Sequence, residues 1–141
     1  MRNKILSSKK LSIFRNKNKT KIIGLAHGVF DLLHYGHILH LKKAKEQCDI
    51  LVVSITASDY VNKGPNRPYY NNKKRLEIMS SLEDVDFIFL SNEKTAKSII
   101  STLKPNIYFK GDEYENISKD YTKNIIKEIN FLKKNKGKII Y

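Results

Sequence analysis

Four short apolar runs without polar alternation are spread along the chain. The first begins at Ile22 and leads to the glycine at position 28, and the others span residues 50–55, 87–90 and 107–109. Runs of this kind are typical of strands that are covered on both faces, as in a parallel sheet. A last strand-like segment covers residues 139–141. The pattern therefore predicts a buried sheet built from these segments.

Amphipathic helical patterns lie between the apolar runs. Apolar side chains recur at helical spacing at positions 38, 41 and 44, at 76, 79 and 82, at 96, 99, 100 and 103, and at 125, 129 and 132. Asn72 is a predicted cap for the second of these helices, and Pro105 ends the third. Because strands and helices alternate, we expect an α/β fold of three layers, in which right-handed crossovers place helices on both faces of a parallel sheet.

The N-terminal residues differ from the rest of the chain. They mix Lys, Arg, Asn and Ser with few apolar side chains. We therefore expect residues 1–19 to form a basic, loosely ordered extension and residues 20–141 to form the folded domain. A chain of 141 residues is long enough to bury a sizeable core as a single domain.

The formal charge of +13 is concentrated at the two ends of the chain. Residues 1–21 contain eight Lys or Arg and no acid, and residues 118–138 contain seven Lys and two acids. Residues 22–117, between them, contain twelve basic and twelve acidic side chains. Nucleic-acid binding needs clustered cations, so the centre of the chain predicts no nucleic-acid partner.

Cysteine usage favours a reducing compartment, and hydropathy predicts no membrane-spanning segment. The single cysteine, Cys48, lies between a helical pattern and an apolar run, where a small buried side chain fits better than a reactive thiol. No apolar stretch approaches the roughly 20 residues of a membrane helix, and the N-terminal residues lack the apolar core of a signal peptide. We expect a cytoplasmic protein with no membrane partner.

The segment from Gly28 to His37, read Gly-Val-Phe-Asp-Leu-Leu-His-Tyr-Gly-His, carries the chemistry. It places His34 and His37 on either side of Gly36, between an apolar run and a helical pattern. If a helix opens at Tyr35, its unpaired N–H groups, the positive end of its dipole and both imidazoles converge on one place, which suits a phosphate. The His-x-Gly-His pattern is short, however, and by itself leaves a packing or capping role open for either histidine.

The flanking residues extend this pattern into a family signature. Gly28-Val29-Phe30-Asp31 followed by His34-Tyr35-Gly36-His37 resembles the signature of the cytidylyltransferase-like nucleotidylyltransferases, which include glycerol-3-phosphate cytidylyltransferase and the heptose-phosphate adenylyltransferase domain. The likeness covers about residues 22–141, and its further elements are Lys63-Gly64, Arg67-Pro68, Arg75, Asp84-Val85-Asp86 and Lys110-Gly111-Asp112-Glu113-Tyr114. The resemblance implies a Rossmann-like sheet of the His-x-Gly-His nucleotidylyltransferase type.

The resemblance also implies a reaction and a set of residues for it. A phosphate oxygen of an acceptor attacks the α-phosphorus of a nucleoside triphosphate, and pyrophosphate leaves without a covalent enzyme intermediate. The catalytic residues that the family pattern implies are His34, His37, Lys63 and Arg75. The nucleotide contacts that it implies are Gly28, Val29, Phe30, His34, Gly36, His37, Lys110, Gly111 and Asp112. The substrate contacts are His27, Asp31, Asp59 and Lys63.

Several of these residues also have structural explanations. Lys63 could be a solvated surface charge, and Arg75 could pair with an acid within the fold, at position 77 or 112. An aspartate at position 31 more often braces its own backbone, and we favour that role for Asp31. A carboxylate at position 59 could serve the start of a helix.

The loops leave the nucleotide and the acceptor open. Residues 30–34 are similar to glycerol-phosphate cytidylyltransferases, whereas Arg67-Pro68 and residues 110–114 are similar to the heptose adenylyltransferase type. We expect transfer of CMP from CTP to a phosphorylated polyol or sugar, with Mg²⁺ accompanying the triphosphate. The first alternative is transfer from ATP to a heptose phosphate. The second is a basic module that binds nucleotide or RNA without catalysis.

The resemblance implies two further partners. Family members continue past the last strand into a Ser/Thr-rich segment and a helix that contact the triphosphate, and no residues here match that segment. We therefore expect the chain to be the N-terminal part of a longer protein with a C-terminal partner domain. Because dimers are common in the family, we also expect a homodimer.

Overall fold

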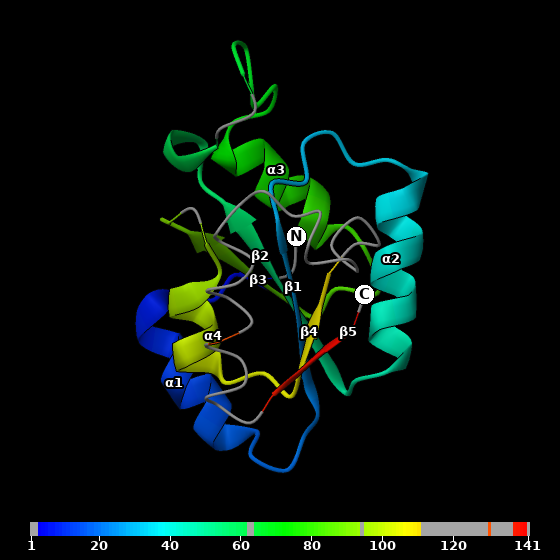
Figure 1. The fold of residues 1–141 in the computed structure, drawn as a ribbon, viewed down its shortest axis with the longest axis vertical. Helices are drawn as coiled ribbons and strands as arrows, with labels where there is room; N and C mark the ends of the chain where they lie inside the picture. Colours follow the sequence, from blue (N-terminus) through cyan, green and yellow to red (C-terminus); the bar gives the residue numbers. More distant parts are fainter. Residues whose placement is uncertain (1–2, 62–63, 94, 111–129, 131–136, 141) are drawn as a thin grey trace.

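The computed structural model describes residues 3–61, 64–93, 95–110, 130 and 137–140. Across these residues the centre is a five-stranded sheet in the order β3-β2-β1-β4-β5, and every neighbouring pair of strands is parallel (Figure 1). The strands are β1 (Ile23–Gly28), β2 (Ile50–Thr56), β3 (Phe87–Ser91), β4 (Ile107–Phe109) and β5 (Lys138–Ile140). Each of them agrees with a predicted apolar segment to within one residue at either end.

Helices cover both faces of this sheet (Figure 1). They are α1 (Ser8–Lys17), α2 (Tyr35–Glu46), α3 (Asn72–Ser80), α4 (Lys97–Leu103) and a short 3-10 helix, η1 (Ser58–Tyr60). Alternate side chains of β2 show how the layers separate, because Leu51, Val53 and Ile55 share a core cluster with α2 and α3. Val52 belongs instead to the cluster that contains α1 and α4. The predicted three-layer α/β fold is therefore confirmed.

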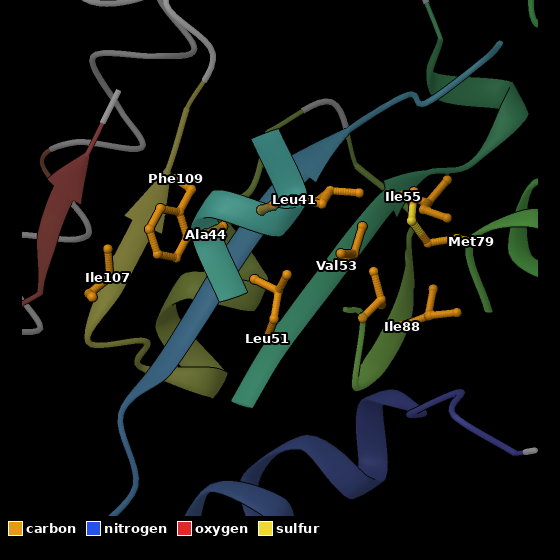
Figure 2. Close-up of a cluster of buried hydrophobic side chains, with 11 residues drawn as sticks. Leu41, Ala44, Leu51, Val53, Ile55, Met79, Ile88, Ile107 and Phe109 are labelled. Atoms are coloured by element: carbon orange, nitrogen blue, oxygen red, sulfur yellow. The ribbon is translucent and has the colours of Figure 1, made fainter. Parts of the chain in front are cut away.

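The core beneath α2 is tightly packed. Figure 2 shows Leu41 of α2 in one cluster with Val53 of β2. At the edge of this cluster, a Cβ on Gly24 would lie 2.5 Å from Cε2 of Phe109 and 2.9 Å from Sγ of Cys48, so only glycine fits at position 24. Burial raises the pKa of the Cys48 thiol to about 11, which keeps it protonated at neutral pH and agrees with the packing role predicted for it.

The N-terminal segment packs against the sheet, which differs from the loosely ordered extension that we expected. The Leu6 N–H donates to the Ile88 carbonyl at 2.8 Å, and the Ile88 N–H donates to the Lys4 carbonyl at 2.9 Å, so this segment pairs with the edge strand β3. α1 follows, and its Leu11 is only 2% exposed. Leu6 and Leu11 are buried, whereas most of the basic side chains stay in solvent; Lys4 and Arg15 are the half-buried exceptions among the described residues of this segment. A composition average cannot show that division.

The helix expected around residues 125–132 lies, apart from residue 130, outside the described residues. Within the described ranges, no helix combines the length and the apolar character that a bilayer-spanning segment needs.

Two substitutions on α1 test whether this helix belongs to the fold. We predict that Leu11→Ala lowers the free energy of unfolding by about 2–4 kcal/mol, because it opens a cavity under a 2% exposed side chain. Ile13→Ala is the matched control, since Ile13 is on the same helix but 55% exposed, and it should change stability by about 0.5 kcal/mol or less. Denaturant unfolding measures both. Equal midpoints for Leu11→Ala and the unsubstituted protein would show that α1 is not part of the cooperative core.

Candidate functional site

The order in which the chain adds strands to the sheet reverses between β1 and β4, and the carboxyl ends of these two strands lie side by side. From β1 the chain moves outward to β2 and β3, and it then returns to the other side of β1 for β4 and β5. Ligands of open α/β sheets bind at such a switch point, outside the carboxyl ends of the strands. Two predicted segments follow these strand ends directly: the histidine segment after β1, and Lys110 after β4.

His34 and His37 together cap the start of α2. The Gly36 N–H donates to Nδ1 of His34 at 3.0 Å, and the His34 N–H donates to Nδ1 of His37 at 3.2 Å. The two rings lie against each other, with centroids 3.9 Å apart and planes tilted by 30°. Because each Nδ1 accepts a hydrogen bond, a neutral ring carries its proton on Nε2. The capping role that the sequence left open is therefore present, and it determines which ring nitrogen is the donor.

Gly36 and Phe30 hold the two histidines in this arrangement. A Cβ on Gly36 would lie 2.8 Å from Cε1 and 3.0 Å from Nδ1 of His34, so a side chain there would displace the capping ring. The ring of Phe30 meets His37 edge-on, with centroids 5.6 Å apart. Phe30 itself has a φ of 51°, and this left-handed turn leads the chain from the end of β1 into the histidine segment.

Arg75 on α3 lies beneath this segment, and only 1% of it is exposed. All five of its N–H groups have acceptors. The acceptors are the carbonyl oxygens of Tyr70, Val29 and Thr56 and the side-chain oxygens of Ser58 and Asn72, at distances between 2.6 and 3.1 Å. Burial lowers the pKa of Arg75, and the charge of Asp31 opposes that shift. The structure thus gives Arg75 a bracing role, and a direct contact with phosphate would require one of these hydrogen bonds to be exchanged.

Asp31 ties the histidine segment to the loop that precedes α3. Its buried carboxylate accepts the N–H of Tyr69 at 2.5 Å and the N–H of Tyr70 at 2.9 Å. Nε of Arg67 lies 3.5 Å from the same carboxylate. Asp31 therefore has a structural role, as the sequence favoured, but it braces the backbone of a distant loop rather than its own. Its committed backbone contacts leave it poorly suited to hold a ligand.

The remaining predicted residues are distributed around this edge of the sheet. His27 on β1 lies between two hydroxyls of β2, with Nδ1 2.9 Å from Oγ of Ser54 and Nε2 3.5 Å from Oγ1 of Thr56. Lys110 is buried, and its Nζ lies 5.0 Å from the ring centroid of Tyr108. Asp59 is exposed on η1, just beyond β2. Lys63, Gly111 and Asp112 lie outside the described residues.

Arg67 belongs to this site, although the sequence showed it only as part of the family likeness. Its Nη2 donates to the carbonyl oxygen of Asp31 at 2.5 Å, across 36 positions of sequence. No local spacing pattern could have revealed so distant a contact. A pocket of about 220 Å³ lies elsewhere, near the amino end of β3, where Lys4 and Asp86 are among its lining residues. The described residues contain no cluster of three or more His, Cys, Asp or Glu side chains that could hold a metal ion.

Known proteins share both the sequence pattern and the fold. Residues 25–138 match the family model described as cytidylyltransferase-like. The bifunctional protein HldE of Paramagnetospirillum magneticum is 40% identical over 102 residues, which are 71% of this chain and 21% of that protein. HldE of Campylobacter fetus subsp. fetus is 39% identical over 113 residues, which are 79% of this chain and 24% of that protein. The chain thus spans about a quarter or less of the length of these relatives.

Solved structures agree with this match. The crystal structure of the lipopolysaccharide core biosynthesis protein from Thermoplasma volcanium has a TM-score of 0.67 at 30% identity, and the match covers 84% of this chain and 94% of that one. Pantoate-beta-alanine ligase from Francisella tularensis also has a TM-score of 0.67, covering 99% of this chain and 66% of that one. Its identity is 21%, so it shows a shared fold alone.

The bracing role of Arg75 predicts a large effect on stability. We expect Arg75→Gln to lower the free energy of unfolding by about 3–5 kcal/mol, because buried carbonyl oxygens would lose their donors. Lys74→Gln is the matched control: Lys74 is the exposed neighbour on the same helix, and its removal should change stability by about 0.5 kcal/mol or less. Thermal and denaturant unfolding measure the difference. An Arg75→Gln protein as stable as Lys74→Gln would contradict the brace.

Proposed function

This chain belongs to the cytidylyltransferase-like family of nucleotidyltransferases, and from that we propose that it transfers the nucleotidyl group of a nucleoside triphosphate to the phosphate of a sugar. The observation that carries the proposal is the pair of capping histidines at the start of α2. They lie at the switch point of the sheet, where both the fold and the helix dipole favour a phosphate.

The proposed reaction is a single displacement at the α-phosphorus. An oxygen of the acceptor phosphate forms a new P–O bond to the α-phosphorus, while the bond from that phosphorus to the bridging oxygen of the β-phosphate breaks. Pyrophosphate leaves with the bonding electron pair. Negative charge therefore shifts toward the leaving group and the oxygens around the α-phosphorus, and fixed donors near these atoms lower the barrier.

The two histidines suit this task because their capping bonds hold them in place. Hydrogen bonds to Nδ1 set both the ring orientation and the position of the proton on Nε2, so His34 and His37 present preorganised donors. Donors that need no rearrangement during the reaction are each worth about 3 kcal/mol in the barrier. The positive end of the α2 dipole adds to the same field.

Magnesium fits the proposal as part of the triphosphate substrate. Mg²⁺ is commonly bound by substrate phosphates together with one or two carboxylates rather than by a dedicated protein cage. Asp31 already accepts two backbone N–H groups, and the described residues offer no cluster of metal ligands. We therefore propose that the metal arrives with the triphosphate, while the chain's own contribution is its cations and N–H donors.

The relatives favour ATP as the nucleotide. The bifunctional HldE proteins correspond to the heptose-phosphate adenylyltransferase type, with 40% and 39% identity in two of them. Arg67-Pro68 and residues 110–114 are also similar to that type. The expectation of CTP, which rests on residues 30–34, is not confirmed and stays as the second candidate. We accordingly propose adenylyl transfer to a heptose phosphate or a related sugar phosphate.

Pyrophosphate release tests the proposal. The protein is incubated with Mg²⁺, one of ATP, CTP, GTP or UTP, and a panel of sugar and polyol phosphates. We predict that His37→Ala and His34→Ala each reduce kcat/KM by about 100-fold or more, since each removes one preorganised donor. His40→Ala is the control, because His40 is on the same helix one turn later and is not in the capping pair.

Three results bear directly on the proposal. Release with ATP and loss in both capping variants, with His40→Ala unaffected, supports it. Release with CTP alone would favour the second candidate nucleotide. No release with any pair, together with no thermal shift from any nucleotide, would overturn transfer by this protein.

A further inference from the structure

Resting on the proposed function, we propose that Arg67 forms a second phosphate-binding position beside the histidine turn, and that it holds a phosphate group of one of the two substrates. Arg67 lies on the loop before α3, apart in sequence from the family signature. Three observations support this assignment: the contacts that hold Arg67, the N–H donors that it retains, and the full engagement of its neighbour Arg75 inside the fold.

Arg67 is held in one orientation by three contacts. Its Nη2 donates to the carbonyl oxygen of Asp31 at 2.5 Å, and its Nε lies 3.5 Å from the carboxylate of the same residue. Its guanidinium carbon lies 4.8 Å from the ring centroid of Tyr69. Stacking on an aromatic ring and a fixed ion pair preorganise a guanidinium, so it loses little freedom when it binds an oxyanion.

The guanidinium nevertheless keeps donor capacity. The side chain of Asp31 is fully buried, and its oxygens already accept the N–H groups of Tyr69 and Tyr70. Asp31 therefore anchors Arg67 without engaging all the N–H donors of the guanidinium. Nε is buried and faces the Asp31 carboxylate, and Nη2 is engaged by the Asp31 carbonyl, so within the described residues Nη1 is the nitrogen left without an acceptor and able to bind an oxyanion. A planar guanidinium with donors to spare is the group that best matches a phosphate.

The neighbouring arginine cannot take this role as readily. Every N–H of Arg75 is engaged inside the fold. The side chain of Arg67, on the loop before α3, is by contrast 28% exposed. Arg67 is also close to the histidine turn, because its partner Asp31 precedes His34 by three residues, a span of about 10 Å at most. One phosphate at the histidines and one at Arg67 would then belong to a single reacting pair.

Arg67→Gln removes the positive charge. Steady-state kinetics of pyrophosphate release then show which of the two substrates binds more weakly. We expect kcat/KM to fall by about 10- to 100-fold, the range for losing a charged hydrogen bond. The matched control is Lys74→Gln, which removes one charge from a residue whose Nζ lies 6.0 Å from the ring centroid of Tyr70, and it should stay within about twofold. A raised KM for the sugar phosphate places Arg67 on the acceptor, and a raised KM for the nucleotide places it on the triphosphate.

Arg67→Lys separates phosphate binding from loop bracing. Lysine keeps the charge but lacks the planar fork, so binding should recover partly, with a KM between those of Arg67→Gln and the unsubstituted protein. If Arg67 only braced the loop, both variants would lower thermal stability equally and neither KM would change. That outcome would overturn the inference.

Loss of the Arg67 contact and absence of the reaction give different kinetic results. An active unsubstituted protein with Arg67→Gln as active as Lys74→Gln would remove Arg67 from the site and leave the reaction intact. An unsubstituted protein that releases no pyrophosphate from any nucleotide would overturn the reaction itself, and the inference with it.

Discussion

The buried guanidinium of Arg75 is the interaction on which the candidate site depends. Its carbonyl acceptors come from the turn after β1, the end of β2 and the loop before α3, at Val29, Thr56 and Tyr70. The first two oxygens lie where strands end and the third lies in a loop, so no sheet ladder supplies their donors, and an unpaired buried carbonyl is destabilising. Arginine stays charged across the physiological pH range even when burial lowers its pKa, so the brace does not weaken with pH.

From this brace the site is built outward in two steps. Asp31 fastens the loop before α3 to the histidine segment, and the histidines then cap α2 through each other's backbone. In the proposed reaction, the same side chains would therefore have both a structural and a chemical role. The capping bonds that stabilise the helix also leave the ring proton on Nε2, where a phosphate can use it. The capping role and the phosphate-binding role of the histidines are alternatives in the sequence, but the geometry allows both at once.

The sequence predicted the layers well because strand burial and helix periodicity are local signals. The apolar runs became β1 to β5, and Leu41 and Ala44 of the predicted stripe became the buried face of α2, whereas Ile38 is 41% exposed. Non-local contacts were beyond such patterns: the Arg67 contact with Asp31 spans 36 positions, and that of Arg75 with Val29 spans 46. α1 was missed for a different reason, since abundant lysine concealed the few apolar side chains that anchor it. The roles predicted for Lys63, Gly111 and Asp112 stay predictions, because these residues lie outside the described part of the chain.

A crystal structure of the protein with Mg²⁺ and a triphosphate that carries a methylene bridge between its α- and β-phosphates would show whether the capping histidines bind the phosphates. The bridge blocks transfer and preserves the bound state. We predict phosphate oxygens within hydrogen-bond distance of Nε2 of both His34 and His37, at the start of α2 and beyond the carboxyl end of β1. A triphosphate bound elsewhere, with both capping histidines unengaged, would contradict this prediction.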